Sequence, residues 1–255
     1  MDSAEYHSAL SALAWQIELG VDTCISDAPI NRYEVPAKVE KPAQAAKAAA
    51  VAAAMPVGEV DVVAAARAAS EAAQDLAGLR AALEAYPHCE LKMGARNLVF
   101  SDGVPGARVM IVGEAPGRDE DREGRPFVGR AGQLLDRMLA AIELSRTSSV
   151  YITNVLPWRP PQNRDPKPEE IAMMQPFLQR HIALAKPDVL VVVGNHACQA
   201  LLGKRGITRL RGEWTTAEGK PALPMFHPAY LLRNPAAKRE AWADLLSLKA
   251  RLRDG

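Results

Sequence analysis

The sequence predicts an α/β fold built around a parallel sheet. Short apolar runs rich in β-branched residues are typical of buried parallel strands, and the segments between them have apolar residues at helical spacing. Strands that alternate with helices form a parallel sheet with right-handed crossovers. A chain of 255 residues is long enough for one such core and some additional structure.

The first part of the chain carries the weaker signals. Residues 5–20 have apolar residues at helical spacing and end at a glycine, which predicts a short helix. Residues 35–57 are mostly Ala, Lys, Pro and Val, a composition that buries too little apolar surface to hold a fold. We therefore expect three regions: a short helical N-terminal segment (1–34), a linker rich in Ala, Pro and Lys (35–63), and a folded domain (64–255).

Within the folded domain the expected elements follow in order. Residues 64–86 predict a helical segment with Leu76, Leu79 and Leu83 on one face, and 97–100 is a short strand or an extended lead into the core. Core strands and helices then alternate. The strands are 109–112, 150–153, 189–193 and 222–226, and the helices are 133–143, 168–185, 197–202 and 236–253.

Polar side chains follow three of these strands. Glu114 comes after the first strand, Asn154 after the second and His227 after the fourth. Because the carboxyl ends of parallel strands meet at one edge of the sheet, we expect these side chains to converge there. Glu114 is followed by Pro, Gly, a charged loop and a single aromatic residue, Phe127. A carboxylate and a planar ring in this arrangement predict a pocket for a flat polar molecule.

The composition excludes several classes of protein. The formal net charge is +1, which gives no general attraction for nucleic acid, although residues 204–253 are locally basic and 119–123 are acidic. Three cysteines at irregular positions fit a reducing compartment and exclude a disulfide framework. The sequence shows neither a leader with basic and apolar regions nor an apolar run of membrane length, so we expect a cytoplasmic protein without membrane contact.

Three stretches of the sequence resemble the signatures of the family 4 uracil-DNA glycosylases, in the same order and at the same spacings. They are GEAPGRDEDREGRPFVGRAGQLL, YITNVLPWRPPQNRDP and PMFHPAYLLRNP, and the resemblance spans most of residues 89–248. It implies a three-layer α/β/α sandwich around a four-stranded parallel sheet, with residues 64–255 as a catalytic domain.

The same resemblance implies a DNA repair enzyme. Such an enzyme flips uracil out of the DNA and hydrolyses its N-glycosidic bond, leaving an abasic site without a lyase step. The expected partner is uracil-containing DNA, single- or double-stranded. We expect the protein to act as a monomer in the bacterial cytosol or nucleoid.

Removal of a flipped pyrimidine requires a stacking face, a group that reads the Watson–Crick edge, and a donor to the oxygen that gathers negative charge. Phe127 can stack on the base. The Asn154 amide can accept from N3–H and donate to O4, a pattern that cytosine reverses. His227 can donate to O2 as a neutral imidazole. Each residue also has an ordinary explanation in packing, capping or burial, but their placement at adjacent strand ends favours a site.

The sugar side of this site depends on the loop after the first strand. Glu114 can orient water and offset the positive charge that develops on the sugar, and Gly113 and Ala115 complete the uracil-binding loop. In the family 1 glycosylases the place of Ala115 holds an Asp that is thought to position the water. Water activation therefore falls to Glu114, with Glu120 as the weaker candidate.

Family 4 proteins usually hold an iron–sulfur cluster on four cysteines. One thiolate cannot hold a cluster that needs four, and only one of the four places in this chain is a cysteine. We therefore expect a branch of the family with no iron–sulfur cluster and no metal, in which bulky side chains fill the space. The four places are Tyr86, Cys89, Trp158 and Met174.

The segment after the fourth strand resembles the loop that pushes an apolar side chain into the gap left by a flipped base. We expect Leu232 to be this wedge, with Leu231 or Tyr230 as alternatives. Arg233 is expected to meet a phosphate, a contact that positions the duplex without reading its sequence.

At other charged positions a DNA contact and a structural role both stay open. Arg159 and Asn163 lie in a loop that resembles the DNA-binding loop of the family, or that is only a rigid turn set by two prolines. The lysines of the linker contribute little specific affinity, and His196 is predicted to be an ordinary residue at the start of a helix. A basic run either meets phosphates or is a solvated face; it consists of Lys204, Arg205, Arg209 and Arg211.

Two other classes of function stay open. The chain could bind uracil-containing DNA without turnover, as a scaffold or a trap, because Ala115 removes one acid that could position water. It could instead bind a free nucleotide or another phosphate ligand at the Gly-rich loop. The loop disfavours this second function, because it lacks the GxxxxGK[ST] pattern and is acidic where phosphates would lie.

Overall fold

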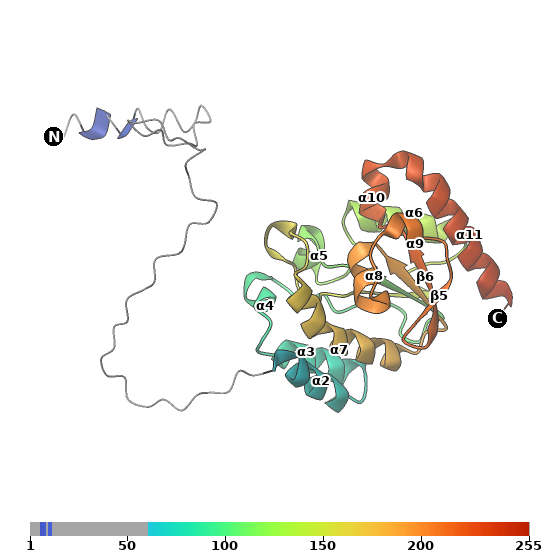
Figure 1. Cartoon of the computed structure of the whole chain (residues 1–255), viewed down its shortest axis with the longest axis horizontal. Coiled ribbons are helices and arrows are strands. Elements are labelled where there is room, and N and C mark those ends of the chain that lie inside the picture. The colour runs from blue at the N-terminus through green and yellow to red at the C-terminus, as the bar shows by residue number, and fades with distance from the viewer. Residues whose placement is uncertain (1–5, 9, 12–60, 255) are drawn as a thin grey trace, which may run out of the picture. The chain divides into compact units, whose positions relative to one another are not determined.

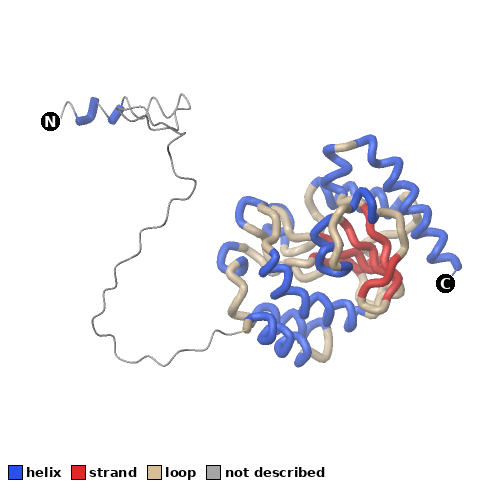
Figure 2. Tube along the Cα trace, viewed as in Figure 1, coloured by secondary structure: helices blue, strands red, loops and turns tan. Residues whose placement is uncertain are grey.

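The structure is a computed structural model that describes residues 6–8, 10–11 and 61–254. Within these residues the centre is a six-stranded sheet in the order β1-β3-β2-β4-β6-β5. The sheet lies between two layers of helices (Figures 1 and 2). The predicted α/β/α sandwich is therefore confirmed.

Four strands form the parallel centre of the sheet, as predicted from their β-branched runs. They are β3 (Val150–Asn154), β2 (Val109–Gly113), β4 (Val189–Val193) and β6 (Lys220–Met225). Two short strands pair antiparallel at the edges, β1 (Asp102–Gly103) and β5 (Thr215–Ala217). The sequence did not predict these edge strands, because two or three residues show no apolar periodicity.

The two faces of the sheet pack against different helices, because successive residues of a strand point to opposite faces. Met110 and Val112 face a layer that contains α2 (Val62–Ala72), α3 (Leu76–Ala85), α7 (Pro168–Ala185) and α8 (Asn195–Leu202). Val109 and Ile111 face α6 (Arg130–Ala140) and α11 (Lys238–Asp254). Full burial of each such side chain stabilises the fold by about 1.5–3 kcal/mol.

Shorter helices lie in the connections. They are α4 (Leu91–Gly94), α5 (Arg118–Glu123), η1 (Pro161–Asn163), α9 (Ile207–Leu210), α10 (Pro228–Arg233) and η2 (Pro235–Ala237).

The structure corrects several predicted elements. The helical segment over 64–86 is two helices, because the Asp75 side chain accepts a hydrogen bond from the Gly78 N–H at 2.7 Å and starts α3 anew. Residues 97–100 are extended, which is one of the two alternatives predicted for them, and the Val99 N–H donates to the Pro157 carbonyl at 2.8 Å. The acidic stretch that we predicted as a loop forms α5.

The predicted domain boundaries stay predictions. Most of the N-terminal segment (1–34) and of the linker (35–63) lies outside the described residues. In the N-terminal segment the structure describes residues 6–8 and 10–11, which are helical. Helix α2 begins at Val62, and the Asp61 side chain caps it by accepting hydrogen bonds from the Val63 and Ala64 N–H groups at 3.0 Å. Among the described helices, none is both long and apolar enough to cross a membrane.

The register of the parallel strands brings their ends to a common edge. Gly113 at the end of β2 pairs with Asn154 at the end of β3, and Val193 of β4 pairs with Met225 of β6. Residues that follow these positions therefore lie together, where ligands bind in open α/β sheets.

Candidate functional site

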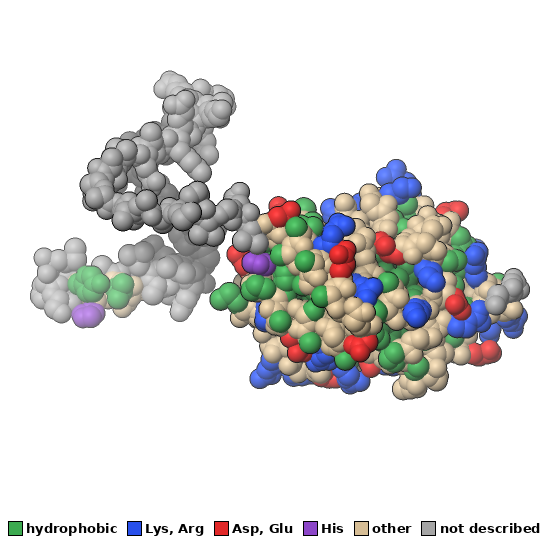
Figure 3. Space-filling view, turned by 90° about the horizontal axis from the view of Figure 1, so that it is seen from below, with side chains coloured by type: hydrophobic (Ala, Val, Ile, Leu, Met, Phe, Trp, Pro, Cys, Tyr) green, Lys and Arg blue, Asp and Glu red, His purple; other side chains and the backbone are tan. Residues whose placement is uncertain are grey.

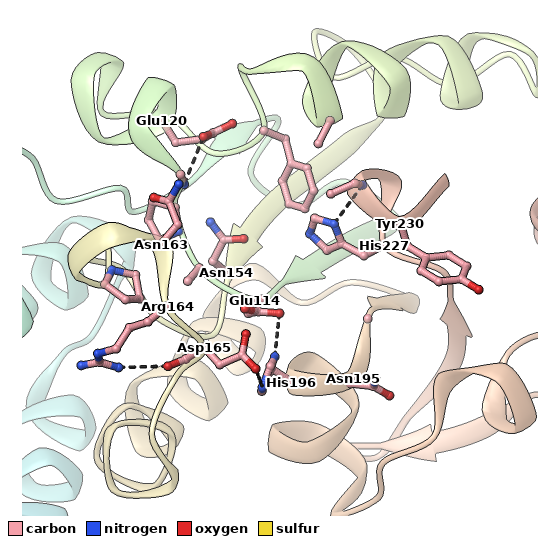
Figure 4. A pocket seen from close by; sticks show the side chains of 18 of the residues that line it. Glu114, Glu120, Asn154, Asn163, Arg164, Asp165, Asn195, His196, His227 and Tyr230 are labelled. Atoms are coloured by element: carbon pink, nitrogen blue, oxygen red, sulfur yellow. Dashed lines mark hydrogen bonds and ion pairs between the residues drawn. The ribbon is translucent and has the colours of Figure 1, made fainter. Parts of the chain in front are cut away.

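A cavity of about 570 Å³ opens at this edge of the sheet. The predicted convergence of Glu114, Asn154 and His227 is found, since all three line the cavity (Figure 4). Other predicted site residues also line it, namely Ala115, Phe127, Asn163, Tyr230 and Arg233. The cavity has the size of a small-molecule pocket, for which about 300–1,000 Å³ is usual.

Gly113 lies directly beneath two of these side chains. A Cβ atom at this position would lie 2.5 Å from Cζ of Phe127 and even closer to Oδ1 of Asn154. No other residue fits here, because real Cβ atoms do not approach neighbours this closely. The Phe127 ring and the Asn154 amide are therefore held side by side against the backbone at the end of β2.

Phe127 has a backbone conformation that bulky residues rarely adopt, with φ of 54°. Arg146 holds it there. The Arg146 guanidinium donates to the carbonyls of Pro126 and Phe127 at 2.9 and 2.6 Å, and it forms ion pairs with Asp102 and Asp136. Sequence reasoning missed Arg146, because no motif marks an arginine that acts on the backbone of another loop.

Glu120 holds the same loop from its other side. One carboxylate oxygen accepts from the N–H groups of Val128 and Gly129 at 3.0 and 2.9 Å, and the other accepts from Gly117 at 3.1 Å. Both oxygens are engaged with the backbone. The structure therefore assigns Glu120 a part in shaping the loop, which argues against the sequence-based suggestion that it activates water.

The His227 ring stacks on the Phe127 ring, with 5.5 Å between centroids and 28° between planes. Its Nδ1 atom accepts a hydrogen bond from the Ala229 N–H at 3.2 Å, so a neutral ring carries its proton on Nε2. Desolvation lowers the pKa of His227, with an opposing contribution from Glu114. At neutral pH the ring is therefore a neutral donor, the form expected from the sequence.

Glu114 contacts a residue that the sequence did not assign to the site. One of its carboxylate oxygens lies 2.7 Å from Nδ1 of His196, as Figure 4 shows. His196 is in the first turn of α8, as predicted, but its ring lines the cavity. The two residues are far apart in the chain, and only the pairing of β2 with β4 brings them together.

Asp165 lies on the far side of the same imidazole, 3.9 Å from Nε2. Glu114, His196 and Asp165 are the group of possible metal ligands found in the described part of the chain, with ligand atoms within 4.8 Å of one another. Glu114 and His196 already contact each other, which occupies one carboxylate oxygen and one imidazole nitrogen of this group. The expectation of no metal stays a prediction.

The residues predicted to contact DNA fall into two groups. On α10, Leu232 is exposed and Leu231 is buried, so Leu231 is not available as a wedge. Asn163 lines the cavity and accepts a hydrogen bond from Nε of Arg159 at 2.7 Å, but Arg159 itself is not a lining residue. Arg159 therefore supports the loop that carries Asn163.

The basic run at 204–211 is not uniformly available to a phosphate. Lys204, Arg205 and Arg209 are exposed. Arg211 forms an ion pair with the buried carboxylate of Asp244, so it is removed from the predicted set. On the face shown in Figure 3, Lys and Arg side chains are interspersed with Asp and Glu, as expected from the small net charge.

The four places of the family's cluster cysteines are buried in one hydrophobic cluster. Tyr86, Cys89, Trp158 and Met174 are between 1% and 3% exposed. The Tyr86 hydroxyl donates to the Val62 carbonyl at 2.6 Å, and burial raises the pKa of the Cys89 thiol. One protonated thiol among apolar and aromatic side chains does not fit a cluster that requires four thiolates.

Comparison with known proteins agrees with the geometry. A family model described as the uracil DNA glycosylase superfamily matches residues 100–246. A type-4 uracil-DNA glycosylase from Thermotoga maritima is 45% identical over 151 residues, which cover 57% of this chain and 77% of the relative. Those from Sulfurisphaera tokodaii and Archaeoglobus fulgidus are 41% and 42% identical over 59% and 61% of this chain, and 73% and 82% of the relatives. The chain therefore belongs to the uracil-DNA glycosylase superfamily, within which it is similar to type-4 proteins.

Proposed function

We propose that this protein excises uracil from DNA, by hydrolysing the N-glycosidic bond of a flipped nucleotide and leaving an abasic site. The observation that carries the proposal is the grouping of Phe127, Asn154 and His227 around one cavity at the carboxyl edge of the parallel strands. Type-4 uracil-DNA glycosylases are the relatives with 41–45% identity, which supports the same reaction.

Each of the three side chains has a separate task on the base. The Phe127 ring stacks on the flipped uracil, a contact worth about 1–3 kcal/mol per base. The Asn154 amide accepts from N3–H and donates to O4. Nε2–H of His227 donates to O2, where negative charge gathers as the bond to the sugar breaks.

Glu114 acts on the sugar. Its carboxylate orients the attacking water and offsets the positive charge that develops at the anomeric carbon. Glu120 takes no part in this step, because its oxygens are bound to the loop backbone. Leu232 fills the gap in the stack, and Arg233 at the rim of the cavity meets a phosphate.

An oligonucleotide with a single uracil tests the proposal. We expect an alkali-labile abasic product from single- or double-stranded substrate. A stable protein–DNA adduct would indicate a trap instead, and binding without product would indicate a scaffold. Replacing Asn154 with Asp removes the donor to O4, so we expect weaker discrimination against cytosine. Unchanged discrimination would remove Asn154 from the base-reading role.

The proposal includes an enzyme without an iron–sulfur cluster. It rests on the one thiol among Tyr86, Cys89, Trp158 and Met174 and on the burial of all four side chains. Purified protein should lack visible absorbance and contain no stoichiometric iron. Four iron atoms per protein molecule, with activity that depends on them, would contradict this part of the proposal. The proposal that the protein excises uracil would still stand.

We further propose that the protein acts as a monomer in the cytosol or nucleoid. The cysteine usage, which fits a reducing compartment, supports the cytosolic placement. Light scattering of the purified protein with and without DNA measures the oligomeric state directly.

A further inference from the structure

In the part of the chain that the structure describes, the Glu114 carboxylate has a single polar partner. That partner is His196, whose Nδ1 lies 2.7 Å from one carboxylate oxygen. The Glu114 side chain is partly exposed to the cavity, whereas His196 is 7% exposed. A buried ring therefore holds one end of a carboxylate whose other oxygen is free to face the cavity.

The contact has a defined polarity. An ionised carboxylate can only accept, so the contact is favourable only when Nδ1 of His196 carries the proton. Its second nitrogen, Nε2, is buried without a hydrogen-bond partner, and the 3.9 Å to Asp165 is too long for a hydrogen bond. A buried polar atom without a partner is costly, so packing alone gives no reason for a histidine at this position.

The backbone fixes where this ring lies. Gly194 follows β4 with φ of 91°, and α8 begins at the next residue, so His196 projects from the first turn of the helix. On its other side Gly194 abuts His227, with 3.2 Å between a Cβ built on the glycine and Cβ of His227. Gly194, at the end of β4, thus positions both the His196 ring, which contacts Glu114, and the His227 ring, which is proposed to face the base.

We propose that His196 is a positioning residue for the excision reaction, which orients the Glu114 carboxylate toward the attacking water and the sugar. This inference rests on the proposed function. A carboxylate held by one oxygen presents the other in a fixed direction, and catalysis depends on such geometry: a displacement of about 1 Å can cost about 100-fold in rate. His196 itself does not touch the reacting atoms.

Two amide variants separate the donor from the bulk of the ring. In His196→Asn the amide nitrogen can take the place of Nδ1, whereas in His196→Gln the longer side chain places it near the position of Nε2. We expect single-turnover excision to slow by about 10- to 100-fold in His196→Gln and His196→Ala, and to stay within about three-fold of wild type in His196→Asn. DNA affinity, measured by anisotropy, should be unchanged in all three.

A double-mutant cycle shows whether His196 acts through Glu114. Once Glu114 is replaced by Ala, adding His196→Ala should have no further effect on the rate, since residues that act as a unit are not additive. Additive losses would overturn the inference, as would wild-type rates in His196→Ala or equal losses in the Asn and Ala variants. His88→Ala, at a histidine outside the cavity, is the matched control.

Failure of the inference and failure of the proposed function give different results. Wild-type protein that releases no uracil would contradict the proposed function. Wild-type protein that releases uracil, with His196 variants that fold and release it equally fast, would contradict only the role of His196. Circular dichroism and thermal denaturation of the Asn and Gln variants establish that they fold.

Discussion

Two regions of the molecule meet at Asn154. They differ in how much open space they contain and in how their polar groups are hydrogen-bonded. On one side is the cavity of about 570 Å³, lined by Glu114, His196 and His227. On the other is a space of about 10 Å³ lined by Asn154, Met174 and His181. Met174 stands at one of the family's cluster-cysteine places, and the side chains at the other three places are also buried. The first region is open to a ligand, and the second has no room for one.

The polar groups of the two regions are satisfied differently. In the packed region they bind one another or the backbone: the Tyr86 hydroxyl donates to Val62, and His181 is hydrogen-bonded to the Tyr151 hydroxyl at 2.8 Å. At the cavity Arg146 and Glu120 bind the backbone of the loop that carries Phe127, while Nε2 of His196 is buried without a hydrogen-bond partner. Substitutions should therefore change the reaction in one region and the free energy of unfolding in the other.

The largest effect is expected at His227. Replacing it with Ala removes the donor to the leaving base, so single-turnover excision should slow by about 10²–10⁴-fold, with little change in DNA affinity. The midpoint of thermal denaturation should shift by only a few degrees. A large loss of stability with an intact rate would mean that the two regions are not separable in this way.

The opposite pattern is expected at Trp158. Its side chain is almost fully buried, so Trp158→Ala should lower the free energy of unfolding by about 3–5 kcal/mol. Excision at a temperature where the variant is folded should stay near the wild-type rate. Trp158→Phe, which keeps an aromatic ring, should lose much less stability and serves as the matched control. Denaturant titration measures both variants.

His181 makes the packed region sensitive to acid. It stacks on Phe100, and burial lowers its pKa to about 3 from an ordinary value near 6.5. The unfolded chain therefore takes up a proton below pH 6.5 while the folded chain does not, so stability is complete above pH 6.5 and falls as the pH is lowered toward 3. The slope in this window is about 1.4 kcal/mol per pH unit.

The measurement is the difference between wild type and His181→Gln, which can keep a polar group near Tyr151 but does not titrate. Denaturant titrations between pH 7 and pH 5 should show the wild type losing stability relative to the variant. Parallel curves for the two proteins would show that His181 does not change protonation on unfolding in this range.

The difference between the regions also explains what the sequence could predict. The four parallel strands and the side chains at their ends follow from local patterns, since β-branched runs mark strands and parallel strands share an edge. His196 and Arg146 could not be found this way. Each acts on a residue that is distant in the chain, and their contacts to Glu114 and Phe127 exist only once the sheet is assembled. The two short edge strands were not predicted, because two or three residues are too few to show an apolar periodicity.

The smallest effect is expected at Cys89, and it is the most direct test of the packed region. A thiol with a raised pKa among apolar side chains behaves as a small hydrophobic group. Cys89→Ala should therefore cost only about 1 kcal/mol of stability and leave excision unchanged. If Cys89 instead served as a ligand, its loss would abolish a visible chromophore and remove far more stability, because metal–thiolate bonds contribute to folding directly. Absorbance spectra and denaturation of the two proteins decide between a packed residue and a vestigial ligand.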